Sequence, residues 1–148
     1  MKDKNVLITI KNTQQPYNDE AITFEPEVIE IITKGKLRTE KNAYTLTYEE
    51  RFSNQKRVTV LNFSEKYKEK TILINKDGNE NTMLIINEGK RINCWYNTDY
   101  GGLQIGVCGE MIKSKLGKDG GNLEFHYKID INSIATSSNK VQINFKYC

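Results

Sequence analysis

One short segment places polar groups where an apolar surface is expected. The segment 44–50 reads YTLTYEE, and its alternation puts Tyr44, Tyr48 and Glu50 on one face of a strand, because successive side chains of a strand point to opposite faces. Leu46 shares that face, so the apolar side carries two phenols and a carboxylate. A buried phenol hydroxyl without a partner costs about 1–3 kcal/mol. The segment therefore predicts either phenols at a barrel mouth, bonded to water or to backbone carbonyls, or the polar wall of a ligand cavity.

Two further tyrosines have the same phase. Tyr96 and Tyr127 alternate with the polar residues of their own strands and share parity with the apolar ones. Apolar walls with a few convergent polar groups are typical of small-molecule sites. We expect Glu50 at the rim of such a site, where it accepts hydrogen bonds from the tyrosines, meets a cationic ligand group, or simply pairs with Arg57 across the next turn.

The sequence argues against an enzyme, which is the least favoured of three function classes. The single histidine, His126, lies between Phe125 and Tyr127, so its side chain is expected on the outer face. Glu49 and Glu50 are neighbours in a strand and point to opposite faces, so they cannot act as a carboxylate pair. No Cys, His or Asp cluster has the spacing of a metal site. We therefore expect no catalytic residue, no metal and no cofactor.

Length and charge restrict the partners. A chain of 148 residues predicts one domain, 1–148. Its net charge of +3, with both signs interleaved, is too small to argue for nucleic acid or a membrane surface. Three cysteines without metal spacing, and an apolar stretch 6–10 too short for a signal peptide, predict reduced thiols in the cytoplasm of a bacterium. Nothing in the composition points to a particular oligomeric state.

The chain alternates with a period of two almost throughout, which predicts an all-β fold. Turn-forming residues separate the alternating segments, and consecutive hairpins make an antiparallel meander of about eight to ten strands. The expected turns are at 77–78, 87–89, 117–121 and 137–139. The segment 64–70 is expected as a short helix or polar turn, and 13–26 as the one long irregular connection.

Three glycines predict how the meander curls. Gly102, Gly106 and Gly109 lie inside one long expected strand, 102–114, where glycine marks a sharp bend or a bulge. The alternation slips after Gly109, which predicts a bulge near that residue. A single barrel hides the edges of such a sheet, and a two-sheet sandwich is the alternative. Trp95 has outward parity.

Three stretches together resemble the YwiB-like family of uncharacterised bacterial proteins. The similarity runs from about residue 27 to the end, through YTLTYEE, the segment 96–103 (YNTDYGGL) and the segment 121–131 (GNLEFHYKIDI). Its second motif, Tyr-x-Thr-x-Tyr-Gly, is carried by Tyr96, Thr98, Tyr100 and Gly101. The resemblance implies a calycin-type, lipocalin-like antiparallel barrel. It implies no catalytic residue, because the family has no assigned activity.

The resulting hypothesis is a barrel that binds a small amphipathic molecule in its lumen. The predicted ligand-binding residues are Tyr44, Tyr48, Glu50, Tyr96, Thr98, Tyr100 and Tyr127. The alternative is a filled barrel that serves as a scaffold and presents its outer face, with Trp95 as a contact, to a protein or an RNA. An open lumen favours the first function, and a packed lumen with a flat exposed patch around Trp95 favours the second.

Overall fold

The alternating segments form ten antiparallel strands. The structure, a computed structural model, describes residues 2–16, 25–41, 43–52, 55–64, 71–77, 82–98 and 101–148, and no helix occurs among them. The strands are β1 (Lys2–Pro16), β2 (Glu27–Glu40), β3 (Ala43–Phe52), β4 (Gln55–Ser64), β5 (Thr71–Asp77), β6 (Thr82–Asn87), β7 (Arg91–Thr98), β8 (Gly101–Leu116), β9 (Gly120–Ile131) and β10 (Ile134–Tyr147).

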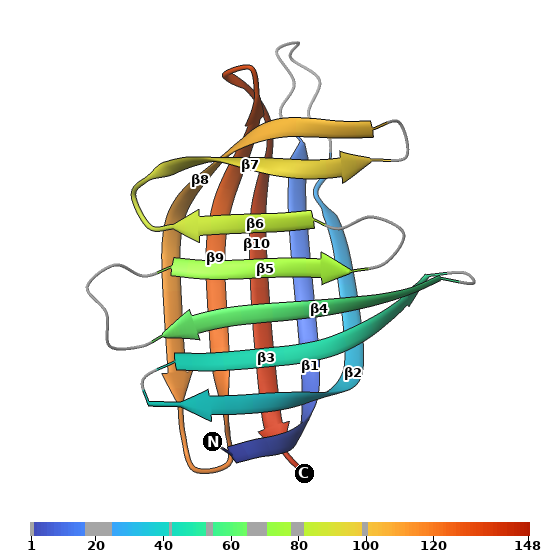
Figure 1. Cartoon of the computed structure of the whole chain (residues 1–148), viewed down its shortest axis with the longest axis vertical. Helices are drawn as coiled ribbons and strands as arrows, with labels where there is room; N and C mark the ends of the chain where they lie inside the picture. Colours follow the sequence, from blue (N-terminus) through green and yellow to red (C-terminus); the bar gives the residue numbers. More distant parts are fainter. Residues whose placement is uncertain are drawn as a thin grey trace.

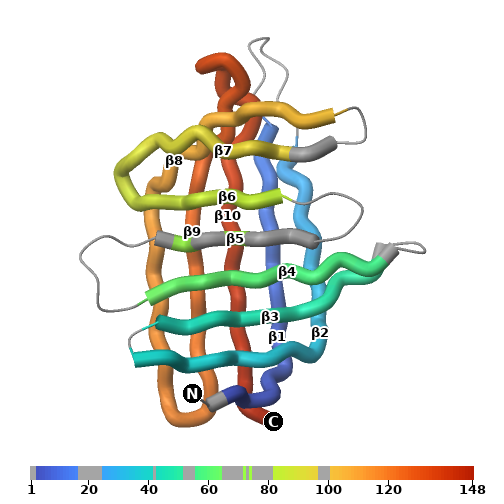
Figure 2. Tube along the Cα trace, in the orientation of Figure 1, coloured from blue at the N-terminus to red at the C-terminus, as the bar shows by residue number. Residues whose placement is uncertain are grey.

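All ten strands belong to one sheet, in the order β6-β5-β4-β3-β2-β1-β10-β9-β8-β7. Each strand pairs with its neighbour in sequence, except at the β6–β7 step, and β1 also pairs with β10. Figure 1 shows β3 to β6 crossing in front of β1, β10, β9 and β8. The tube in Figure 2 shows β2 and β8 bending from one layer into the other. The predicted all-β antiparallel meander is thus confirmed, as one sheet curled into a half-barrel.

The core is the inner face of this curled sheet. Buried residues alternate along most strands; in β9, for example, Leu123, Phe125 and Tyr127 face inward. Phe125 and Phe145, from neighbouring strands, are among the largest fully buried side chains. Each apolar side chain buried in this way contributes about 1.5–3 kcal/mol to stability. The two layers therefore stabilise each other through side chains of a single sheet.

At the turn 87–89 the chain does not form a hairpin, although every other pair of consecutive strands does. Gly89 has the positive φ (81°) that the turn needs, but β6 and β7 form no ladder among the described residues. The turn meets β8 instead: Gly89 donates from its backbone N to the oxygen of Gly109 at 2.9 Å. The Glu88 carboxylate accepts from the backbone N of Ile112 at 2.8 Å. The turn predicted at 87–89 is therefore present, but the hairpin expected around it is wrong, because the turn pairs with β8 and β6 does not pair with β7 among the described residues.

The last predicted turn is also wrong, because β10 begins earlier. The chain reverses at Asn132 and Ser133, which have φ values of 52° and 67°. Two consecutive residues with positive φ are typical of tight hairpin turns. Ser137 and Asn139, expected in the turn, are buried on the inner face of β10. The turn predicted at 117–121 joins paired β8 and β9, and β5 pairs with β6 around the turn predicted at 77–78, of which Gly78 lies outside the described residues.

Two other predicted connections are only partly described. The segment 13–26 was expected to be irregular, but β1 continues to Pro16 and pairs with β10 up to Ser137. Residues 17–24 lie outside the described residues. Ser64 ends β4, and residues 65–70 of the predicted short helix or turn also lie outside them.

The bulge predicted near Gly109 is confirmed. The pairing of β8 with β9 shifts between Gly109 and Met111. A Cβ at Gly109 would collide with the backbone of Asn87, so the close approach of the 87–89 turn requires glycine here. The bulge bends β8 and lets it run in both layers.

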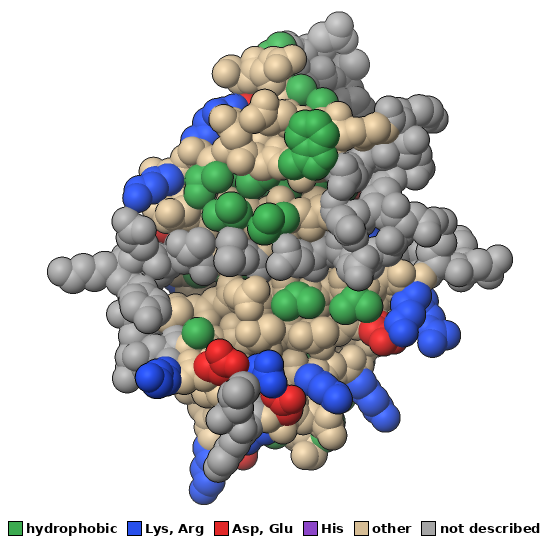
Figure 3. All heavy atoms as spheres, in the orientation of Figure 1, with side chains coloured by type: hydrophobic (Ala, Val, Ile, Leu, Met, Phe, Trp, Pro, Cys, Tyr) green, Lys and Arg blue, Asp and Glu red, His purple; other side chains and the backbone are tan. Residues whose placement is uncertain are grey.

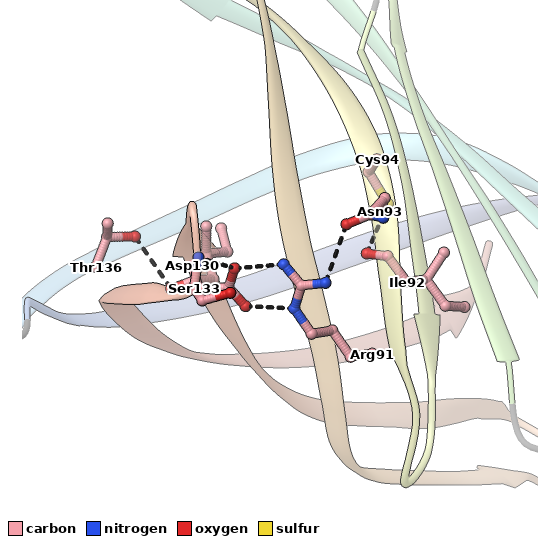
Figure 4. A network of polar contacts seen from close by, with 8 residues as sticks. Arg91, Ile92, Asn93, Cys94, Asp130, Ser133 and Thr136 are labelled. Carbon is pink, nitrogen blue, oxygen red and sulfur yellow. Dashed lines mark hydrogen bonds and ion pairs between the residues drawn. The ribbon is translucent and has the colours of Figure 1, made fainter.

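Gly102 and Gly106 have a role beyond bending, because each lies beneath a side chain of β7. A Cβ at Gly102 would meet the indole of Trp95, which is 58% exposed and points outward as predicted. Above Gly106, the Arg91 guanidinium reaches the Asp130 carboxylate with contacts of 2.6 and 2.8 Å (Figure 4). Through these hydrogen bonds Arg91 holds the pKa of Asp130 below its ordinary value. Both glycines therefore leave room for side chains that join β7 to its neighbours.

We expect Gly35→Ala to lower the free energy of unfolding by at least about 2 kcal/mol, in the range of overpacked cores. Gly35 in β2 faces inward, and a Cβ there would overlap the Thr47 carbonyl oxygen and the Ile8 side chain. The matched control is Gly117→Ala, where a Cβ meets its nearest atom at 3.7 Å. Urea denaturation of both variants measures the difference, and equal stability of the two would contradict the packing described.

Candidate functional site

The sheet parts between β2 and β3 beyond Gly35. Their ladder runs from the pair Glu40–Ala43 to the pair Gly35–Tyr48 and ends there. Nearer its start, β2 stays paired with β1, while the end of β3 stays paired with β4. The two strands thus follow different layers, and a gap opens between residues 27–34 and 49–52 in the described part of the chain.

A cavity of about 170 Å³ lies behind this gap, between the two layers. Its apolar walls are Ile10, Ile29, Ile31, Leu61, Ile74, Leu84, Phe125, Val141 and Ile143, and its polar walls are Asn12, Tyr48, Glu50, Arg57 and Tyr127. An engineered apolar cavity of about 150 Å³ is known to hold benzene. The volume therefore suits one molecule of about that size.

The gap is an entrance to the cavity. A groove on the outer surface, with a volume of about 330 Å³, runs along β2 and the end of β3. It shares Ile29, Ile31 and Glu50 with the cavity behind it. Thr33 crosses the gap and donates a hydrogen bond to the backbone oxygen of Glu49 at 3.3 Å. Glu50 therefore lies where groove and cavity meet.

The Tyr48 phenol and the Glu50 carboxylate are buried side by side at this entrance. Glu50 is only 9% exposed, and Tyr48 is buried beside it. Burial raises the pKa of the Tyr48 phenol above its ordinary value, and the Glu50 carboxylate raises it further by its charge and by accepting a hydrogen bond. The hydroxyl of Thr59 lies opposite Tyr48 in the ladder and lowers the pKa of the phenol. The Thr59 oxygen is nevertheless too far from, or badly aligned with, any partner to form a hydrogen bond among the described residues. The phenol therefore stays protonated and donates.

Tyr127 approaches the cavity from the other layer. Burial raises the pKa of its phenol to about 12, with a smaller contribution from the charge of Tyr96. In the ladder with β10 it lies opposite Asn139, whose side-chain nitrogen donates to the Ser137 hydroxyl at 3.1 Å. Asn12 lines the same cavity, and its side-chain oxygen has no hydrogen-bond partner among the described residues. Polar groups thus gather at this end of the core.

Three of the predicted site residues come together at the cavity, namely Tyr48, Glu50 and Tyr127. Tyr44 does not, because it lies near the other end of β3 and stacks on Phe63 with ring centroids 5.4 Å apart. Tyr96 is 39% exposed and does not line the cavity. Alternation along a strand predicts that a side chain points inward, but it does not predict how far along the barrel axis that side chain lies.

Two predicted residues remain untested by the geometry. Thr98 is the last residue of β7, and its side chain is not described. Tyr100 lies outside the described residues.

Sequence reasoning missed three polar residues at this end of the barrel. Asn12 follows Ile8 and Ile10 in inward phase, and Ser137 and Asn139 precede Val141 in the same way. Extending each apolar alternation into its polar flank would have found them. The outward position of His126 is as predicted; its Nε2 lies 3.2 Å from a Glu124 carboxylate oxygen on the outer face of β9.

The described residues contain no group of three or more His, Cys, Asp or Glu side chains arranged to hold a metal ion. Within the same part of the chain, no helix has the length and apolar character needed to cross a membrane. The cavity therefore offers hydrogen bonds, one buried carboxylate and apolar contacts as its means of recognition.

Comparison with known proteins agrees with the fold. A family model described as "Domain of unknown function (DUF1934)" matches residues 8–143. The crystal structure of the ywiB protein from Bacillus subtilis aligns with a TM-score of 0.80 and 19% sequence identity, over 99% of this chain and 93% of that chain. No curated protein matches the chain. The resemblance to YwiB-like proteins is confirmed.

The raised pKa of Tyr127 predicts a loss of stability in alkali. An unfolded tyrosine ionises near pH 10, whereas folded Tyr127 binds its proton up to about pH 12. Between these values the folded state holds more protons, so the free energy of unfolding falls as pH rises. Urea denaturation at about pH 9 and about pH 11 should show a fall that is about 1 kcal/mol smaller in Tyr127→Phe than in the wild type. An equal fall in both proteins would show that Tyr127 is not buried as described.

Proposed function

We propose that this chain, which belongs to the DUF1934 family, binds one small molecule in the cavity behind the β2–β3 gap. The observation that carries the proposal is the cavity itself, in which Tyr48, Glu50 and Tyr127 converge within apolar walls. Protein interiors are close-packed, and a void of this volume left empty forfeits on the order of 4 kcal/mol. A bound ligand would recover those contacts.

The position of Glu50 supports binding rather than packing alone. A carboxylate that is 9% exposed has lost most of its water and needs compensating partners. Arg57, directly opposite in the β3–β4 ladder, and Tyr48 supply charge and a donor from the protein. Keeping a charged group at the meeting point of groove and cavity is costly for a purely structural core. It suits the orientation of a polar ligand group.

The size of the cavity narrows the expected ligand. Pockets for drug-sized ligands have volumes of about 300–1,000 Å³, and this cavity has about 170 Å³. A ligand inside the barrel would be bound as in lipocalins. Because the cavity is small, the amphipathic molecule expected from the sequence must have a short apolar part. The three cysteines are free, which supports the proposed cytoplasmic location.

The rival function, an interaction module, has one observation in its favour. Apolar side chains gather on the outer face in the upper half of Figure 3, and Trp95 and Met83 on β7 and β6 are both at least half exposed. Trp95 has a structural role, because it covers Gly102. The cavity between the layers favours a small-molecule ligand over a filled scaffold.

Filling the cavity tests this proposal. Val141 lines it, so Val141→Phe should place the ring in free space, change the unfolding free energy by less than about 1 kcal/mol, and abolish binding. Val107 is 0% exposed and does not line the cavity, so Val107→Phe should cost about 1–3 kcal/mol or more.

Binding is measured by ligand-observed NMR with benzyl alcohol, indole and similarly small compounds on the wild type and Val141→Phe. If no compound binds the wild type, or if Val141→Phe binds as the wild type does, the cavity is not the binding site.

A further inference from the structure

We infer that the ligand is a small organic amine, a primary ammonium group on an apolar body no larger than a benzene ring, held with its nitrogen at Glu50. This inference rests on the proposed binding function and specifies its ligand. The inference is based on the polar groups that line the cavity, on the groove that leads to them, and on the apolar walls of the cavity.

Two side chains that line the cavity, Glu50 and Asn12, can accept a hydrogen bond from a ligand. A carboxylate offers about four lone-pair sites, of which the Tyr48 phenol uses one of those on Glu50. The side-chain oxygen of Asn12 has no hydrogen-bond partner among the described residues. An ammonium group brings three donors and no acceptor, which matches such a set.

The one cation at the cavity does not reverse this preference. Arg57 lines the cavity opposite Glu50, and it is already engaged in an interaction within the chain. An anionic ligand would have to approach that buried carboxylate, and like charges in a poorly solvated site repel strongly.

Glu50 is the carboxylate that the groove and the cavity share. Glu49 also lines the outer groove, but it does not line the cavity, and it pairs with Lys56 at 3.0 Å. Beyond Glu50 the walls become apolar, with Leu84 and Phe125 among them. The rings of Phe125 and Tyr127 stack with centroids 6.0 Å apart and offer an apolar wall to the body of a ligand. An amine headgroup would therefore stop at the rim while its body enters the cavity.

Three compounds of equal size separate charge from shape. Benzylamine, benzyl alcohol and benzoate are titrated into the wild-type protein by calorimetry or NMR, at neutral pH in a buffer without amines. We expect benzylamine to bind at least about tenfold more tightly than benzyl alcohol, a difference of about 1.4 kcal/mol, and benzoate to bind more weakly than both. This comparison uses the wild type alone and does not depend on a variant that folds.

Glu50→Gln should remove the preference for benzylamine over benzyl alcohol, since the amide keeps the size of the side chain but not its charge. Glu49→Gln is the matched control on the outer face and should keep the full preference.

The outcomes separate this inference from the proposed function. Equal affinity for amine and alcohol, or tighter binding of benzoate, overturns the inference and leaves binding in the cavity intact. An undiminished preference in Glu50→Gln also overturns it, because the amine would then be recognised elsewhere. If no compound binds the wild type, the proposed function fails together with the inference.

Discussion

A single sheet with one apolar face can bury that face only against itself, and the rest of the structure depends on this constraint. Ten strands carry alternating apolar residues, and they form one continuous sheet rather than two independent ones. The sheet must therefore bend until its two ends meet, as Figure 1 shows. Strands long enough to run in both layers, such as β2 and β8, connect the layers covalently.

Bending a sheet requires local departures from regular pairing, and these create the candidate site. Gly35 allows β1 and β3 to approach β2 closely, and the β2–β3 ladder ends at this residue. The shift at Gly109 bends β8 and receives the turn that closes the barrel. Where the ladder ends, the layers diverge, and the inner face there carries Tyr48 and Glu50. The cavity is thus a consequence of how the sheet turns its corner.

Local chemistry predicted much of this fold and less of the site. Alternation identified the strands, the outward Trp95 and the bulge at Gly109, because these depend on neighbouring residues. It also placed Tyr44 and Tyr48 on the same inner face, yet they lie at different heights and only Tyr48 reaches the cavity. Height depends on strand register and on where the β2–β3 ladder ends, which involve residues far apart in sequence. The polar flank around Asn139 resembled a turn because a serine-rich sequence is ambiguous between turn and strand.

The core holds a cavity where the ladder between β2 and β3 ends. A crystal structure of the protein under xenon pressure would show this cavity, because xenon enters apolar cavities and marks its own position. We expect xenon between the two layers, in contact with Ile31, Leu84 and Phe125 and beneath the Glu50 carboxylate. A structure in which side chains fill this space, with β2 and β3 paired past Gly35 and no xenon between the layers, would contradict this expectation.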